Sequence, residues 1–76
     1  MLVTIAKVHE NLFVGEAFSL TAPTTEGEVT ILPKHEPLVA NLKAGTIRVK
    51  TEAGEKIFEV LDGVLEVSGN QATVLL

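Results

Sequence analysis

The stretch that organises this chain, residues 26–48, reads EGEVTILPKHEPLVANLKAGTIR. A strand-like run ends at Pro33, and Pro37 closes a charged turn made of Lys34, His35 and Glu36. Proline cannot donate to a β-ladder and biases the residue before it toward extended geometry, so the two prolines predict a rigid corner with His35 near its tip. Presenting a stiff corner to a partner costs little entropy, which favours a docking surface over a catalytic pocket.

The segments on either side of the corner indicate short strands. Leu2–Val8 alternates in the manner of a strand, and Phe18 and Leu20 alternate with polar residues up to Pro23. Leu38–Leu42 fits either a strand or a single helical turn, because periodicity cannot decide over so few residues. No segment has sustained helical periodicity, and turn signals recur about every 8–12 residues. The sequence therefore predicts an all-β fold, a small sandwich or barrel.

Two hairpins are expected in the last thirty residues. With Ala53-Gly54 as a two-residue loop, Arg48 lies opposite Glu59 as a cross-strand pair. With Gly69-Asn70 as the second loop, Leu65 lies opposite Val74, and Gly-Asn between alternating runs is a hairpin signal. Each register collects the apolar residues on one face, and a slip of one residue would move them to the other. The expected buried residues are Ile47, Val49, Phe58, Val60, Leu65, Val67 and Val74.

Length and composition bound the functional class. The 76 residues make one small domain, and the absence of cysteine rules out a disulfide or a thiolate metal site. The net charge of −4 argues against a nucleic-acid partner, which would need a basic face. No apolar run approaches the roughly 20 residues of a membrane span, and the start of the chain lacks the features of a signal peptide. These observations predict a soluble intracellular domain.

Few residues in the chain could carry chemistry. Glu36 is next to His35, but neighbouring strand residues point to opposite faces, so a catalytic pair is disfavoured against an interface or structural histidine. His9-Glu10 and His35-Glu36 suggest a cupin-like metal site, although two histidines in unrelated turns are a weak signal. A carrier domain would need a modified lysine at a hairpin tip. No phosphate-binding or nucleophile motif is present, and we predict no cofactor.

The central stretch also resembles a known family. Five segments carry the resemblance: Glu26-Gly27-Glu28, Ile31-Leu32-Pro33, His35, Pro37-Leu38-Val39 and Gly63-x-Leu65-Glu66-Val67. They resemble the amino-terminal β-domain of the epsilon subunit of F-type ATP synthase, whose mitochondrial counterpart is called delta. The resemblance implies one β-sandwich domain over residues 1–76, with two packed sheets of about ten short strands. Lys34, Glu36 and Asp62 depart from the family, which has small residues there. The family also continues into a helical hairpin, which is lacking after Leu76.

The resemblance further implies a function. A domain of this kind is a non-catalytic rotor subunit of the central stalk, which docks on the gamma subunit and the ring of c subunits and couples proton transport to ATP synthesis. It implies that Glu28 faces the c-ring and that Lys7 and His35 lie near gamma. The location implied is the cytoplasmic face of the inner membrane, peripheral and through the complex only. We expect a chain ending at Leu76 neither to bind nucleotide nor to inhibit hydrolysis. A small cupin-like metal-binding β-barrel stays open as the alternative.

Overall fold

The structure, a computed structural model that describes residues 1–76, consists of strands and connecting turns. The nine strands are β1 (Leu2–Lys7), β2 (Glu10–Glu16), β3 (Ser19–Thr24), β4 (Gly27–Ile31), β5 (Leu38–Leu42), β6 (Gly45–Thr51), β7 (Gly54–Val60), β8 (Gly63–Ser68) and β9 (Gln71–Leu75). The all-β prediction is confirmed, with nine strands rather than about ten. Leu38–Leu42, which the sequence left open, is a strand. No helix of the length and apolarity needed to cross a bilayer is present.

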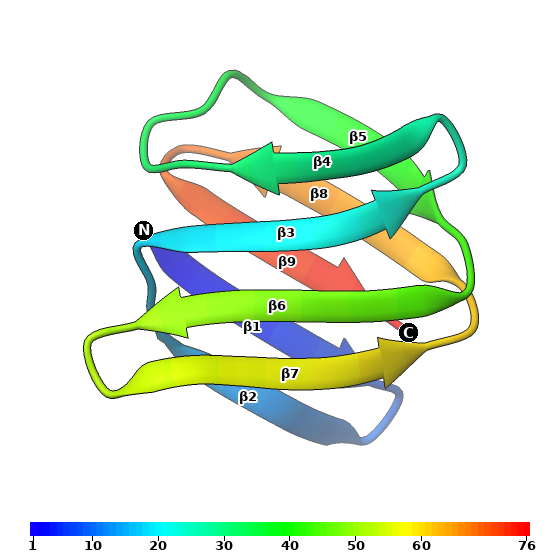
Figure 1. Cartoon of the computed structure of the whole chain (residues 1–76), viewed down its shortest axis with the longest axis horizontal. Helices are drawn as coiled ribbons and strands as arrows, with labels where there is room; N and C mark the ends of the chain where they lie inside the picture. Colours follow the sequence, from blue (N-terminus) through cyan, green and yellow to red (C-terminus); the bar gives the residue numbers. More distant parts are fainter.

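The strands form two layers that face each other (Figure 1). The five-stranded layer has the order β2-β1-β9-β8-β5, and the four-stranded layer has the order β4-β3-β6-β7. Neighbours are antiparallel except β1 and β9, which run parallel. A single bridge, Thr24 opposite Leu42, joins the layers, supported by hydrogen bonds from the backbone N–H of Thr25 to the carbonyl of Asn41 and from Lys43 to Pro23. The sandwich is therefore one sheet folded over on itself.

The core between the layers is aliphatic. Six of the seven residues predicted to be buried are buried, with Ile47, Val49, Leu65 and Val74 fully inaccessible. Phe58 is the exception: it is only half-buried, because β7 is the edge strand of its layer. Its ring meets Phe13 from β2, the edge strand of the other layer, in an edge-to-face contact with centroids 6.1 Å apart. This aromatic pair closes the open side of the sandwich between the two edges.

The register of the last hairpin is as predicted, and that of the preceding one is not. Leu65 lies opposite Val74 and Val67 opposite Ala72, with Gly69-Asn70 as the loop. The β6–β7 hairpin turns at Glu52-Ala53 instead of Ala53-Gly54, so Arg48 lies opposite Ile57 and not opposite Glu59. The error is a shift of two residues along the partner strand. Side chains alternate with a period of two, so the shift left every residue on its predicted face.

A threonine sets the turn that the prediction misplaced. The hydroxyl of Thr51 accepts a hydrogen bond from the N–H of Ala53 and donates one to the carbonyl of Gly54. The β3–β4 hairpin repeats the arrangement, with the Thr24 hydroxyl bonded to Glu26 N–H and Gly27 carbonyl. The glycines have φ of 118° and 119°. A Thr-x-x-Gly pattern therefore forms both turns, because its hydroxyl satisfies the backbone and its glycine accepts the positive φ.

The chain changes layers at Leu61-Asp62, between β7 and β8. Because β7 and β8 are not paired with each other, this connection is a crossing between the layers and not a hairpin turn. Gly63 adopts φ of 146°, and a Cβ there would lie 2.5 Å from the carbonyl oxygen of Leu75. Only glycine fits this crossing, because β9 passes directly over it. The first turn, between β1 and β2, lies at Val8-His9.

Candidate functional site

The connections of the sandwich gather at two ends, seen at the left and right of Figure 1. The proline-corner end, on the left, contains Met1, Ala17-Phe18, residues 32–37, Glu52-Ala53 and Gly69-Asn70. The C-terminal end, on the right, contains Val8-His9, Thr25-Glu26, Lys43-Ala44, Leu61-Asp62 and Leu76. Every candidate site residue of the sequence lies at or near one of these ends.

The corner predicted from the two prolines is present and is held by three hydrogen bonds. The N–H of His35 donates to the carbonyl of Leu32 at 3.1 Å, which forms the turn. Lys34 adopts a left-handed conformation with φ of 66°, and its N–H donates to the side-chain oxygen of Asn70 at 2.8 Å. The Nδ1 atom of His35 lies 2.6 Å from the carbonyl oxygen of Glu36. The charged side chains of the corner are exposed, so it offers them to solvent or to a partner.

The two histidines do not form a shared site. His35 interacts with a backbone carbonyl rather than a carboxylate, and His9 lies in the β1–β2 turn at the opposite end of the molecule. No group of three His, Asp or Glu side chains is close enough to hold a metal ion. The tips of the four hairpins carry no lysine that a carrier domain would modify. No observation on the structure therefore favours the cupin-like or carrier alternative.

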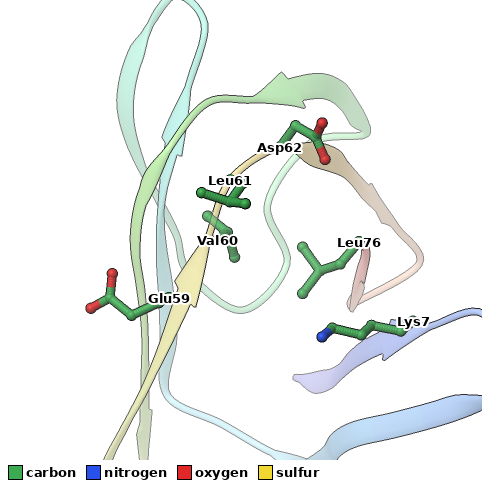
Figure 2. Close-up of a pocket in the computed structure, with 6 residues that line it drawn as sticks. All are labelled: Lys7, Glu59, Val60, Leu61, Asp62 and Leu76. Atoms are coloured by element: carbon green, nitrogen blue, oxygen red, sulfur yellow. The ribbon is translucent and has the colours of Figure 1, made fainter.

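Lys7 and His35, both expected near one partner, lie at opposite ends of the same layer. Lys7 ends β1 and lines a hollow of about 280 Å³ at the mouth of the sandwich, together with Glu59, Val60, Leu61, Asp62 and Leu76 (Figure 2). His35 lies just before β5, at the proline-corner end. Both residues thus border the five-stranded layer, but no single small patch contains them.

Glu28, the residue expected at the c-ring, belongs to the other layer. It lies on β4, opposite Pro23 and two residues after the Thr25-Glu26 tip, and its side chain is exposed. Because β4 pairs only with β3, Glu28 is on an edge strand at the C-terminal end of the four-stranded layer. The structure therefore separates Glu28 from His35 by the length of the sandwich.

The outer face of the five-stranded layer carries four exposed aliphatic side chains. Val14, Val39, Val64 and Leu75 point outward and are 55%, 70%, 36% and 54% exposed. Val14 lies opposite Thr4 and Val64 opposite Leu75, whereas Val39 lies opposite Glu66 and Asn41 is the other partner of Val64. Glu66 is the one charge in the middle of the layer, and Glu16, Ser68 and Gln71 also point outward toward the proline-corner end. We call this surface the apolar face after its aliphatic members; its residues are Leu2, Thr4, Ala6, Val14, Val39, Asn41, Val64, Glu66, Thr73 and Leu75.

The outer face of the four-stranded layer is polar, and its side chains bind each other. Thr21 and Thr30 share a hydrogen bond of 3.0 Å between their hydroxyls, and the Thr46 hydroxyl donates to Glu59 at 3.2 Å. Arg48 lies 3.5 Å from Glu55, diagonally across the β6–β7 pair. We call this surface the polar face; its residues are Thr21, Glu28, Thr30, Thr46, Arg48, Lys50, Glu55, Ile57 and Glu59. Ile57, at 53% exposure, is its single apolar member.

The sequence reasoning missed the apolar face, although a signal for it is present. Leu38-Val39-Ala40 and Val64-Leu65 are apolar at consecutive positions, and consecutive positions of a strand point to opposite faces. Strands of this kind are typical of sheets covered on both sides. The five-stranded layer is covered on one side only within this chain, which leaves its second apolar side available.

Comparisons with known proteins identify the family. The family described as the beta-sandwich domain of the ATP synthase delta/epsilon chain matches residues 1–76. The ATP synthase epsilon chains of Psychrobacter arcticus and Corynebacterium jeikeium are 47% and 42% identical over 93% of this chain. This chain spans about half the length of these relatives, 52% and 59%.

Solved structures agree with the sequence matches. A cryo-EM structure of the Euglena gracilis mitochondrial ATP synthase, with OSCP, F1 and c-ring, contains a chain with a TM-score of 0.88 and 25% identity, over 96% of this chain and 48% of that one. The Tetrahymena thermophila central stalk and c-ring structure shares the fold at a TM-score of 0.80 and 18% identity, over 97% of this chain and 60% of that one. The chain therefore belongs to the ATP synthase delta/epsilon chain family, as its β-sandwich domain.

Proposed function

We propose that this domain is a non-catalytic part of the rotor of an F-type ATP synthase. In this role it docks on the gamma subunit through the apolar face and the proline corner, and it contacts the c-ring through the β3–β4 hairpin with Glu28. The domain then couples the proton-driven ring to the catalytic head as a stiff body with two contact surfaces. It is peripheral to the membrane and is held there by the complex, on the cytoplasmic face of the inner membrane.

The observation that carries the proposal is the contrast between the apolar face and the polar face. Contiguous exposed apolar residues on a small domain mark an interaction site, because an uncovered apolar surface is unfavourable in water. In the middle of the polar face, hydroxyls and charges contact one another within the chain, whereas Glu28 lies on the edge strand β4. A partner on the apolar face also accounts for the separation of Lys7 and His35, since both residues border that face at its two ends.

The position of Glu28 supports a second, separate contact. Glu28 lies in the four-stranded layer, so a partner at the β3–β4 hairpin leaves the apolar face free for another. The two layers are closely packed over a fully buried aliphatic core, and packed interiors deform little. A load applied at the hairpin would therefore be transmitted to the opposite layer instead of being lost in bending.

Binding to gamma tests the first contact with a matched pair of variants. Val39 and Ile57 are both β-branched, outward-facing and more than half exposed, at 70% and 53%, on β5 and on β7. We expect Val39→Asp to raise the Kd for gamma about 10- to 100-fold, because the interface would bury an unpaired charge, while Ile57→Asp changes it less than about twofold. Equal effects of the two variants in titration calorimetry would reject the apolar face as the gamma contact.

Cross-linking tests the second contact. A cysteine placed at Glu28 is expected to form a disulfide with a cysteine in the polar loop of subunit c in the assembled synthase. Thr30, two residues along the same face of the same strand, provides the matched control, since it is also exposed but farther from the tip. Similar cross-linking from both positions, or none from Glu28→Cys, would place the β3–β4 hairpin outside the c-ring contact.

A further inference from the structure

We propose that Asn70, at the tip of the β8–β9 hairpin, is a positioning residue that holds the proline corner in the shape it presents to a partner. This inference rests on the proposed function, because it assigns the corner to the gamma contact. It concerns a residue 36 positions along the chain from Lys34, and neither residue type nor spacing marks that residue as part of the corner.

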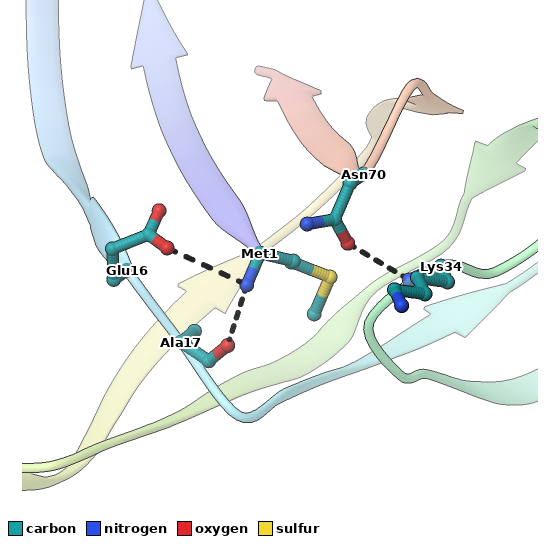
Figure 3. A network of polar contacts seen from close by, with 5 residues as sticks. All are labelled: Met1, Glu16, Ala17, Lys34 and Asn70. Carbon is teal, nitrogen blue, oxygen red and sulfur yellow. Dashed lines mark hydrogen bonds and ion pairs between the residues drawn. The ribbon is translucent and has the colours of Figure 1, made fainter.

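The contact is between the corner and the side chain of the hairpin. The side-chain oxygen of Asn70 accepts the N–H of Lys34 at 2.8 Å (Figure 3). The backbone carbonyl of Asn70 accepts the N–H of Leu2 at 3.2 Å, so the same residue is fastened to the start of β1. Asn70 therefore connects the corner to the five-stranded layer, whose outer side is the apolar face.

Lys34 needs such support because of its backbone. A lysine with φ of 66° is in the left-handed region, which residues other than glycine, asparagine and aspartate rarely adopt. Each proline fixes its own φ and biases the residue before it toward extended geometry. Lys34 follows Pro33 and is two residues away from Glu36, so neither restriction places it in the left-handed conformation. The hydrogen bond that the Lys34 N–H donates to the side-chain oxygen of Asn70 favours the N–H orientation that the left-handed conformation provides.

The hairpin itself does not require the amide of Asn70. Gly69 and Asn70 have φ of 57° and 61°. A type I′ hairpin turn requires positive φ at both central residues, and glycine adopts positive φ at no steric cost. The tip is joined to β1 through Leu2. The residue before Leu2 is itself held in place: the amino terminus of Met1 donates to the carbonyl of Ala17 at 3.1 Å and lies 3.7 Å from Glu16 (Figure 3). The side-chain amide of Asn70 is therefore available to bind the Lys34 N–H, and the Asn70 backbone is fixed to β1.

Amide exchange of the chain in solution tests the positioning role without any partner. Asn70→Gly keeps the positive φ and removes the acceptor, so we expect exchange of the Lys34 amide to accelerate about threefold to tenfold. Asn70→Asp retains an oxygen at the same place and should keep the exchange slow. Thr51→Ala removes the side-chain bonds of another hairpin tip at the same end and should leave the Lys34 amide unchanged. Unchanged Lys34 exchange in Asn70→Gly would overturn the proposal.

Binding to the cognate gamma subunit tests whether the held shape matters. We expect Asn70→Gly to weaken binding about threefold to tenfold, and Asn70→Gly with Lys34→Gly to recover part of the loss, because glycine at position 34 adopts positive φ unaided. If Asn70→Gly weakened binding only by destabilising the whole domain, adding Lys34→Gly would not restore the affinity for gamma. Faster Lys34 exchange with unchanged gamma affinity would overturn the positioning role while the proposed function stands. Failure of the unaltered chain to bind gamma would instead reject the proposed function, and the exchange result would be unaffected.

Discussion

The apolar face exposes Val14, Val39 and Leu75 by 55%, 70% and 54%, whereas the polar face surrounds its one exposed aliphatic residue, Ile57, with threonines and paired charges. Both faces belong to layers that contribute side chains to one buried core. The outward residues of a strand do not enter that core, so folding does not require them to be apolar or polar. The comparison shows that two layers can share one core and still present different chemistry on their outer faces.

The largest expected effect separates the inside of a layer from its outside. Leu65 is fully buried and Leu75 is 54% exposed, on neighbouring strands of the five-stranded layer. Leu65→Ala should lower the free energy of unfolding by about 2–5 kcal/mol through lost burial and a cavity. Leu75→Ala should lower it by less than about 1 kcal/mol, because the side chain stays largely in water. Urea denaturation measures both. Equal losses would mean that the apolar face is already covered within this chain.

The next effect concerns the edge where the two layers meet. Phe58 is half-buried against Phe13, so Phe58→Ala should cost about 2–3 kcal/mol, less than full burial would imply. A double-mutant cycle with Phe13→Ala should yield a coupling of about 0.5–1.5 kcal/mol. Phe18→Ala is the control, since Phe18 is 62% exposed at the proline-corner end and should change stability by only about 0.5 kcal/mol. Zero coupling would show that the aromatic pair does not hold the layers together.

A smaller effect tests the corner at the margin of the apolar face. Lys34→Glu places a second negative charge beside Glu36. We expect the association rate with gamma to fall about twofold to threefold at low salt, and the difference to shrink near 0.5 M salt as charges are screened. Lys50→Glu, on the polar face, serves as the control with the same charge change. An unchanged association rate for Lys34→Glu at low salt would place the corner outside the interface.

The smallest effect is expected on the polar face. Arg48 and Glu55 are 3.5 Å apart, and their side chains are 51% and 35% exposed, so solvent screens the pair. Arg48→Met should change the free energy of unfolding by less than about 0.5 kcal/mol and leave gamma binding unaltered. A loss of gamma binding comparable to that of Val39→Asp would break the distinction between the two faces.

In the hairpins, local sequence predicted which side chains are buried but not the position of every turn. The alternation of apolar residues in 47–60 determined which side chains enter the core, and a register error of two residues did not disturb that assignment. The predicted loop, Ala53-Gly54, lies one position too late in the chain. Thr51 bonds to Ala53 and Gly54 and moves the turn one position earlier. The Thr-x-x-Gly pattern was present twice in the sequence and would have located both turns.

In the candidate site, local sequence does not predict how the residues lie relative to one another. Two prolines predicted the corner, and the resemblance to the family pointed to Lys7, Glu28 and His35. Whether those three residues form one patch depends on which strands become neighbours, and that is settled by contacts between residues far apart in the chain. The layer order places Lys7 and His35 at two ends of one layer and Glu28 in the other.

The sequence by itself determined the all-β class, the inward residues and the corner, because each follows from alternation or from backbone restrictions within a few residues. Tertiary structure alone decided that Phe58 is at an edge, that Asn70 reaches Lys34, and that Val14, Val39, Val64 and Leu75 share one exposed face. The physical reason is the same in each case. A side chain's neighbours on a sheet come from other strands, and strand order depends on the packing of the whole chain rather than on any one segment.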